Sequence, residues 1–235
     1  GRLKEAGLLR LMEHAGKKIE DEDMAAAMKG KGLGTPATRA DTIEKLISRE
    51  FIGRGKGGSL RATAHGIKMI DILRRIPVEW ITSAELTGDM ESKLDGVQKG
   101  THKRDSYMGT IREIVQEMVD KIRDHDRSEL YAKDAPLGSC PLCAANIGET
   151  VLSYICEKNE GRDKGCSFVM WKDASGRWFD RNTTTRLLEN KTIEKLHGFF
   201  SRDGSPYEVS VSIGDDGKVN IAGSNAETTS SDDEE

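Results

Sequence analysis

The chain has 235 residues, of which 36% are hydrophobic and 32% charged, and its formal net charge at pH 7 is −4. That length allows one or two domains with modest cores. No apolar run approaches the roughly 20 residues of a membrane span, and the N-terminus lacks a signal-peptide pattern. These features favour a soluble, intracellular protein, and the start at Gly1, inside a helical pattern, indicates a fragment of a longer one.

A glycine-rich loop that leads into a helix is the most informative local feature, within residues 30–52. Its glycines allow the backbone to approach another molecule closely because they carry no Cβ; they are Gly30, Gly32 and Gly34. Thr35 is expected to cap the following helix, with Pro36 at the first helical position.

That helix is predicted to be amphipathic. Its apolar stripe is made by Ile43, Leu46 and Ile47. The opposite side carries Thr38, Arg39, Lys45 and Arg49. With Arg39 beside free N–H groups at the positive end of the helix dipole, the segment is a natural anion site. The alternative is an ordinary capped helix without a ligand.

A hairpin and a further helix are expected next. Short strands over residues 51–53 and 60–63 flank a turn that contains Arg54 and Lys56, and the order helix, hairpin, helix is the layout of a winged helix. From Lys29 to Arg75 there are eleven Lys or Arg and four Asp or Glu, an excess of seven positive charges in an acidic chain. This local excess indicates a polyanion partner.

Three sequence blocks follow one another here as they do in type IA DNA topoisomerases: MEHAGKKIEDEDMAAAMKGKGLGTPATRADTIEKLI, LRATAHGIKMIDILRRIP and TSAELTGDMESKLDGVQKG. The resemblance covers about Leu8 to His125 and is greatest to the topoisomerase III branch. It implies the last part of the toroidal core, whose groove holds single-stranded DNA. The positions that match the phosphate-contacting motif are Gly34, Thr35, Thr38 and Arg39. The other expected DNA-binding residues are Lys31, Arg54, Lys56 and Arg61.

The rest of the chain divides by composition. A long amphipathic helix from about Met108 to Ile122 should close a first domain of residues 1–127, and residues 128–138 are predicted to be a linker. Residues 139–222 form a second domain of short strands and one helix, and residues 223–235 form an acidic, disordered tail. The predicted fold is α+β: a mostly helical domain containing a winged helix, then a small zinc-ribbon-like α+β domain.

All four cysteines lie in the second domain with the spacing C-x2-C-x12-C-x9-C; they are Cys140, Cys143, Cys156 and Cys166. Four thiolates that converge on one ion make a closed, structural zinc site without an open catalytic position. A reducing cytosol argues against disulfides. The alternative is a set of small buried residues that no longer bind metal.

Aromatic residues follow the cysteines. The segments CSFVMW and RWF are predicted to form a hairpin, and a short helix is expected from Thr183 to Asn190. The pattern that begins at Gly165-Cys166 and ends at Tyr207 resembles the C-terminal repeat domain appended to type IA topoisomerases, and this resemblance covers most of residues 139–213. Trp171 and Trp178 are candidates for stacking on bases of a single strand. Most of the aromatics are expected in the core, with one of these two tryptophans facing solvent.

The resemblance implies an enzyme that cuts one DNA strand with a tyrosine, passes another strand and reseals, with Mg²⁺ held by acidic residues. None of the chain's tyrosines lies in the nucleophile's sequence context, so this chain alone is expected to be inactive and to bind single-stranded DNA. A monomer in the cytoplasm, associated with the nucleoid, is expected. Two alternatives stay open: a non-catalytic single-strand-binding module, and a winged-helix transcription regulator with a metal-binding domain.

Overall fold

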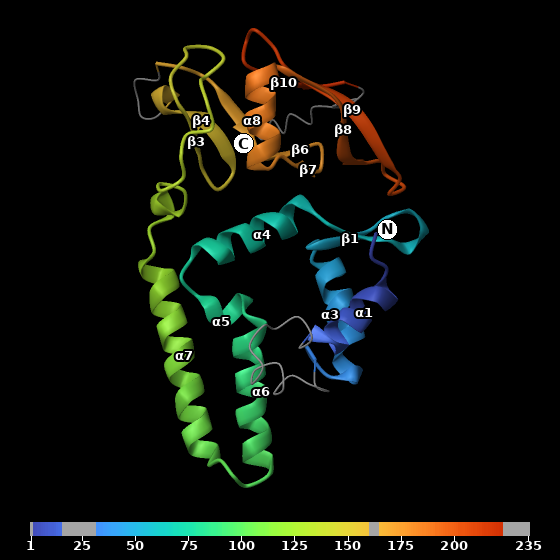
Figure 1. The fold of residues 1–235 in the computed structure, drawn as a ribbon, viewed down its shortest axis with the longest axis vertical. Coiled ribbons are helices and arrows are strands. Elements are labelled where there is room, and N and C mark those ends of the chain that lie inside the picture. The colour runs from blue at the N-terminus through green and yellow to red at the C-terminus, as the bar shows by residue number, and fades with distance from the viewer. Residues whose placement is uncertain (1, 16–31, 160–164, 223–235) are drawn as a thin grey trace, which may run out of the picture. The chain divides into compact units, whose positions relative to one another are not determined.

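A computed structural model describes residues 2–15, 32–159 and 165–222 of the chain (Figure 1). The chain divides into two compact units, unit 1 (Gly1–Lys133) and unit 2 (Asp134–Glu235). Both helices and small sheets occur, which confirms the α+β prediction. The division falls inside the predicted linker, whereas the predicted acidic tail, residues 223–235, lies outside the described residues.

Unit 1 is mostly helical, as predicted. The α-helices in the part of unit 1 that the structure describes are α1 (Glu5–Glu13), α3 (Pro36–Ser48), α4 (Ala64–Arg75), α5 (Glu79–Thr82), α6 (Ala84–Gln98) and α7 (Arg104–Asp124). The strands β1 (Ile52–Arg54) and β2 (Leu60–Ala62) form an antiparallel hairpin between α3 and α4, with the 3-10 turn η2 (Lys56–Gly58) at its tip. A second 3-10 turn, η3 (Arg127–Leu130), follows α7. The predicted order of helix, hairpin and helix is therefore confirmed.

Local capping signals explain where these helices begin. Thr35 is the N-cap of α3 and Pro36 occupies its first position, as predicted. The Thr63 hydroxyl accepts a hydrogen bond of 3.0 Å from the Gly66 N–H and so caps α4. The same hydroxyl donates to the carbonyl of Phe51, at 3.1 Å, so the cap also ties the start of α4 to the hairpin.

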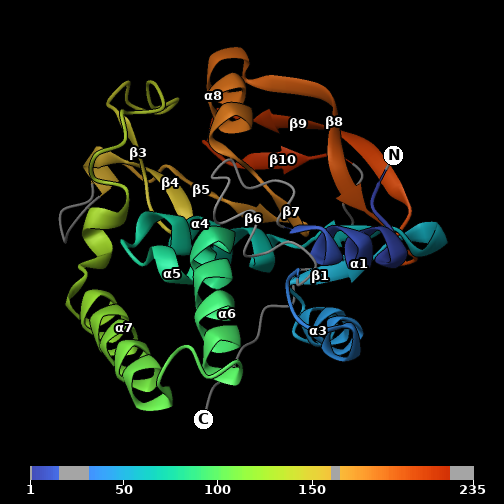
Figure 2. The same cartoon turned by 60° about the horizontal axis from the view of Figure 1, so that its bottom comes forward.

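The helices α6 and α7 lie side by side and are joined by a short turn (Figures 1 and 2). Ile114 of α7 is buried, while Val115 and Val119 are about half exposed. The predicted long amphipathic helix is confirmed. No helix in the described part of the chain has the length and hydropathy that crossing a membrane requires.

In its described residues, 134–159 and 165–222, unit 2 contains three small sheets and one α-helix, α8 (Arg181–Asn190). Its first sheet, in the order β3-β4-β5, contains β3 (Ile147–Glu149), β4 (Ser153–Cys156) and β5 (Val169–Trp171). The second is the hairpin of β6 (Asp173–Ala174) and β7 (Arg177–Trp178). The third, in the order β10-β9-β8, contains β8 (Thr192–Phe200), β9 (Pro206–Ile213) and β10 (Val219–Ile221). The short 3-10 turn η4 (Glu157–Asn159) follows β4.

One large hydrophobic cluster holds unit 2 together. It joins residues of the first sheet, of α8 and of the third sheet, the last including the fully buried Phe199. Phe168, just before β5, and Phe179, between β7 and α8, are also fully buried in it. The short predicted helix is confirmed as α8, which begins two residues earlier than expected. Its start is explained by Asp180, whose side chain accepts a hydrogen bond of 2.9 Å from the Thr183 N–H.

One prediction of local structure was wrong. Residues of the CSFVMW segment pair with β4 and not with RWF, and the hairpin is instead the tight β6–β7 pair. Its turn residues Ser175 and Gly176 have φ of 52° and 70°, the twist that a two-residue hairpin requires. Within the predicted linker, Tyr131 is only 5% exposed.

Candidate nucleic-acid interface and metal centre

The glycine loop packs against the C-terminal end of α1. The Leu33 N–H donates a hydrogen bond of 2.8 Å to the carbonyl of Met12. Gly32 is buried and has φ of +68°, and a Cβ added there would lie 2.4 Å from that same carbonyl oxygen. Only glycine fits this position, because both the backbone conformation and the space exclude a side chain.

The surface beyond that contact is exposed and polar. Gly34, Thr35 and Thr38 are all exposed. The Thr38 hydroxyl accepts a hydrogen bond of 3.0 Å from the Thr35 N–H, and the two hydroxyl oxygens lie 3.0 Å apart. The start of α3 therefore presents two adjacent hydroxyl groups at the positive end of a 13-residue helix.

The sequence predicts that Arg39 faces solvent, but in the structure it does not. It is 7% exposed and lies on the buried side of α3 with Ile43. Its Nε donates a hydrogen bond of 3.1 Å to the carbonyl of Leu33. The prediction that Arg39 lies on the exposed face was wrong, because the glycine loop packs over its guanidinium group and the Leu33 carbonyl of that loop takes a hydrogen bond from it.

The hairpin carries three of the predicted DNA-binding residues, Arg54, Lys56 and Arg61, and their environments differ. Arg54 donates through Nε to Glu5, at 2.7 Å, and through Nη2 to Glu44. These two carboxylates raise the pKa of Arg54. Arg54 therefore ties the hairpin to α1 and α3, and its charge is balanced within unit 1.

Lys56 and Arg61 occupy different environments on the hairpin. Lys56 is exposed at the tip, where Gly57 has open space around it. Arg61 pairs across the hairpin with Gly53, and a Cβ at Gly53 would lie 3.4 Å from the Arg61 guanidinium carbon. Lys31, the remaining predicted DNA-binding residue, lies outside the described residues.

The four cysteines of unit 2 converge. Their Sγ atoms all lie within 4.8 Å of one another. Cys140 and Cys166 approach to 3.6 Å, and Cys143 and Cys156 to 3.5 Å. A tetrahedral site with Zn–S bonds of about 2.3 Å has sulfur–sulfur edges of roughly 3.8 Å. The geometry thus fits a four-thiolate metal centre, and none of the four thiols is in a disulfide.

Main-chain hydrogen bonds and burial act differently on these thiols. The N–H of Ala145 lowers the pKa of Cys143 to about 7. Burial raises the pKa of Cys140, and it raises that of Cys156 to about 12. A divalent cation favours the thiolate form of its ligands. The donor set is therefore suited to a thiophilic cation in a site with little solvent access.

Comparison with known proteins relates both units to one family. The sequence profile of the family described as DNA topoisomerase matches residues 1–109. DNA topoisomerase 3 of Bacillus thuringiensis (strain Al Hakam) is 34% identical over 167 residues, which are 68% of this chain and 22% of that protein. DNA topoisomerase 1 of Methanothermobacter thermautotrophicus is 30% identical over 156 residues, 64% of this chain and 21% of that protein.

The chain belongs to the type IA DNA topoisomerase family. It spans about a fifth of the length of these relatives. The family match at residues 1–109 includes the glycine loop, α3 and the hairpin. Because the match to the Bacillus protein covers 167 residues, similarity to this family extends beyond residue 109.

Of the two candidate stacking residues, only one is well exposed. Trp171, on β5, is 59% exposed, which confirms that one of the two tryptophans faces solvent. Trp178 is half-buried. Leu152 lies close to Trp171 in the fold, because its carbonyl accepts a hydrogen bond of 2.9 Å from the N–H of Lys172, the residue after Trp171. Its side chain is 50% exposed.

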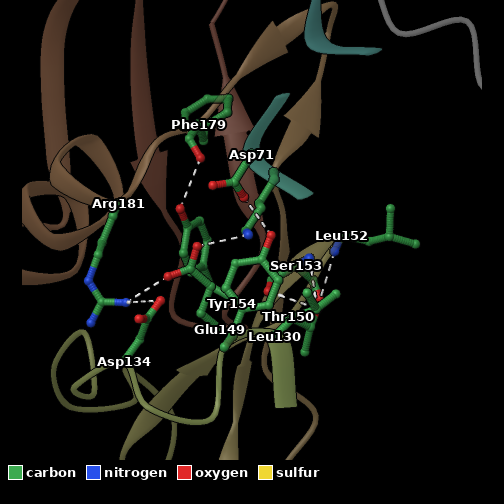
Figure 3. A network of polar contacts seen from close by, with 12 residues as sticks. Asp71, Leu130, Asp134, Glu149, Thr150, Leu152, Ser153, Tyr154, Phe179 and Arg181 are labelled. Carbon is green, nitrogen blue, oxygen red and sulfur yellow. Dashed lines mark hydrogen bonds and ion pairs between the residues drawn. The ribbon is translucent and has the colours of Figure 1, made fainter. Parts of the chain in front are cut away.

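A buried ion-pair network was missed by sequence reasoning (Figure 3). Lys172 Nζ lies 2.8 Å from Glu149 Oε1, and the two side chains are 1% and 5% exposed. The other oxygen of Glu149 accepts from Arg181 at 2.6 Å. Tyr154 lies beside this network and donates to the carbonyl of Phe179 at 3.1 Å. Burial, with the Glu149 charge, raises the pKa of Tyr154. The only sequence signal was a lysine directly after a tryptophan, which alone does not distinguish burial from exposure.

Proposed function

We propose that this chain is the C-terminal portion of a type IA DNA topoisomerase that changes DNA topology by transient cleavage of one strand, strand passage and religation. Family membership supports the parent activity, and the chain's span of about a fifth of its relatives supports its being a portion. The chain's own contribution is to hold single-stranded DNA while groups elsewhere in the parent cut and reseal it.

The chain by itself is not expected to cleave DNA, because none of its four tyrosines lies in the sequence context of the family's nucleophile. Two of them are also inaccessible. Tyr131 and Tyr154 are 5% and 1% exposed, and each phenol hydroxyl donates to a partner inside its own unit. A nucleophile must be accessible and activated by a neighbouring base. The tyrosine nucleophile and the acidic residues that hold Mg²⁺ would belong to the rest of the parent protein.

The observation that carries the single-strand proposal is the shape of the glycine loop. Its buried half is held on α1 by the hydrogen bond from the Leu33 N–H to the Met12 carbonyl, and Arg39 donates to the Leu33 carbonyl. Its exposed half presents Gly34, Thr35 and Thr38. Hydroxyl groups and a helix N-terminus are typical phosphate partners. We assign Lys56 and Arg61, on the hairpin that follows the other end of α3, as further cations of the interface. We assign Arg39 the role of a positioning residue beneath the loop.

Unit 2 would add a second contact. Trp171 is exposed on a sheet whose inner face is held by the core, so its ring is available for base stacking. Cys140, Cys143, Cys156 and Cys166 would hold a structural zinc ion. When bound, the ion supplies folding free energy to unit 2 and no reaction chemistry.

A titration of the purified chain tests this function. A labelled single strand and a duplex of the same sequence are compared by fluorescence anisotropy over a series of salt concentrations. We expect tighter binding of the single strand, little dependence on base sequence and a steep loss of affinity with salt. Preferential, sequence-dependent binding of the duplex would overturn the proposal in favour of a transcription regulator.

A further inference from the structure

The segment that joins the two units is anchored at both of its ends. On the unit 1 side, Arg75 Nη1 donates a hydrogen bond of 3.1 Å to the carbonyl of Leu130. The Arg75 guanidinium carbon lies 3.9 Å from the centre of the Tyr131 ring. The Tyr131 hydroxyl in turn donates to Asp71 at 2.5 Å. Arg75 and Asp71 both lie on α4, so residues 130 and 131 are held by that helix.

The unit 2 side has a matching arrangement. Arg181 Nη2 donates to the carbonyl of Ala135, and Arg181 Nη1 lies 3.9 Å from Asp134 (Figure 3). Two residues further on, Leu137 is buried, and its N–H donates to the carbonyl of Ile147 at 2.9 Å. The chain therefore belongs to unit 2 from Asp134 onward.

Both anchors use the same chemistry. In each, an arginine donates to a main-chain carbonyl and also pairs with a carboxylate of its own unit, Arg75 with Asp71 and Arg181 with Glu149. Hydrogen bonds from a charged donor are stronger than neutral ones. The two arginine side chains are 24% and 33% exposed, so solvent screens them only in part.

We propose that the pivot between the two units is the dipeptide Ala132–Lys133, and not the eleven-residue linker that composition suggests. Both residues are exposed. The Ala132 N–H bonds to the carbonyl of Glu129 at 3.3 Å, and a turn covers residues 131–133. The pivot that we propose therefore consists of the backbone bonds after the Ala132 nitrogen. Three residue steps from Tyr131 to Asp134 span at most about 10–11 Å. The units can then reorient about this point, but the anchored ends cannot separate further.

Backbone relaxation of the full chain by NMR tests the pivot directly. We expect low order parameters, below about 0.6, at Ala132 and Lys133, and values near 0.85 at Leu130, Tyr131 and Leu137. Uniformly low values across residues 128–138 would overturn the proposal, because the whole segment would then be a flexible linker. Uniformly high values across residues 130–137 would also overturn it, because no pivot would exist.

A proteolysis experiment tests the role of the unit 1 anchor. Arg75→Gln should release Leu130 and Tyr131 and accelerate Lys-C cleavage after Lys133 by roughly five- to thirty-fold, the factor for one to two kcal/mol. Tyr131→Phe, which keeps the ring, should give a smaller increase. The matched control is Arg123→Gln, because Arg123 is exposed and its partners Asp120 and Asp124 lie on its own helix. Cleavage after Lys133 that is equally fast in the control and in Arg75→Gln would contradict the anchor.

Discussion

The Nε of Arg39 donates a hydrogen bond of 3.1 Å to the carbonyl of Leu33, inside the turn that leads into α3. This contact places the cation beneath the glycine loop, where it is 7% exposed. Arg39 therefore organises the loop that we propose to contact phosphates and is not itself well placed to reach them.

Replacement of Arg39 separates these two roles. We expect Arg39→Met to lower the free energy of unfolding by about 1–3 kcal/mol, since the Leu33 carbonyl loses its donor. Single-strand affinity should fall as well, but its salt dependence should stay the same. The comparison is Lys56→Ala, at the exposed hairpin tip, which should leave stability unchanged and reduce the salt slope by about 0.7. A reduced slope in the Arg39 variant would show that this guanidinium contacts phosphate directly.

Gly32 and Gly57 form a matched pair for testing the loop's packing. Their φ angles are +68° and +72°, but only Gly32 has backbone atoms within 3.0 Å of an added Cβ. Gly57→Ala should cost about 1 kcal/mol through backbone strain alone. Gly32→Ala should cost more, and should also weaken single-strand binding. Equal losses of stability in chemical denaturation would show that the loop does not press on α1.

Replacement of Glu149 and replacement of Lys172 should lower the free energy of unfolding by different amounts. Glu149→Gln leaves a buried lysine without its carboxylate and should cost about 3–5 kcal/mol. Lys172→Met should cost less, because Glu149 keeps Arg181 as a partner. The double variant should recover part of the loss in a thermodynamic cycle. Strictly additive effects on the free energy of unfolding would argue against direct coupling of the two charges.

Metal removal should affect the two units differently. Chelation is expected to unfold unit 2 and spare unit 1, since the four cysteines all lie in unit 2 and structural zinc supplies folding free energy. Heteronuclear NMR spectra recorded before and after chelation would show which resonances collapse. Metal analysis of the purified chain should find about one zinc ion, the capacity of one four-thiolate site. Less than about half an equivalent would contradict a zinc site.

Trp171 offers a test of stacking that is independent of stability. At 59% exposure, Trp171→Ala should change the free energy of unfolding little, whereas single-strand binding should weaken by about 1–3 kcal/mol for each stacked base. Leu152→Ala, at a neighbouring exposed position, serves as the control for a general surface effect. Equal binding by the Trp171 variant and the parent chain would remove this residue from the interface.

Local sequence determined much of the secondary structure. Thr35 and Pro36 set the start of α3, and Ser175–Gly176 set a tight turn, because each signal acts within a few residues of the chain. The cysteine spacing likewise anticipated that the four sulfur atoms meet. The family resemblance was also readable from the order of three blocks, which is a property of the sequence alone.

Only the tertiary structure decided which charges stay available. Arg39 turns inward because the glycine loop folds over it, and Arg54 is neutralised by Glu5, which lies 49 residues earlier in the chain. Lys172, between β5 and β6, is buried beside Glu149, which comes from β3. Each outcome depends on partners brought together by packing, and the energy of a charge is governed by those partners and by solvent access. Composition along the chain counts such charges but cannot tell which are already paired.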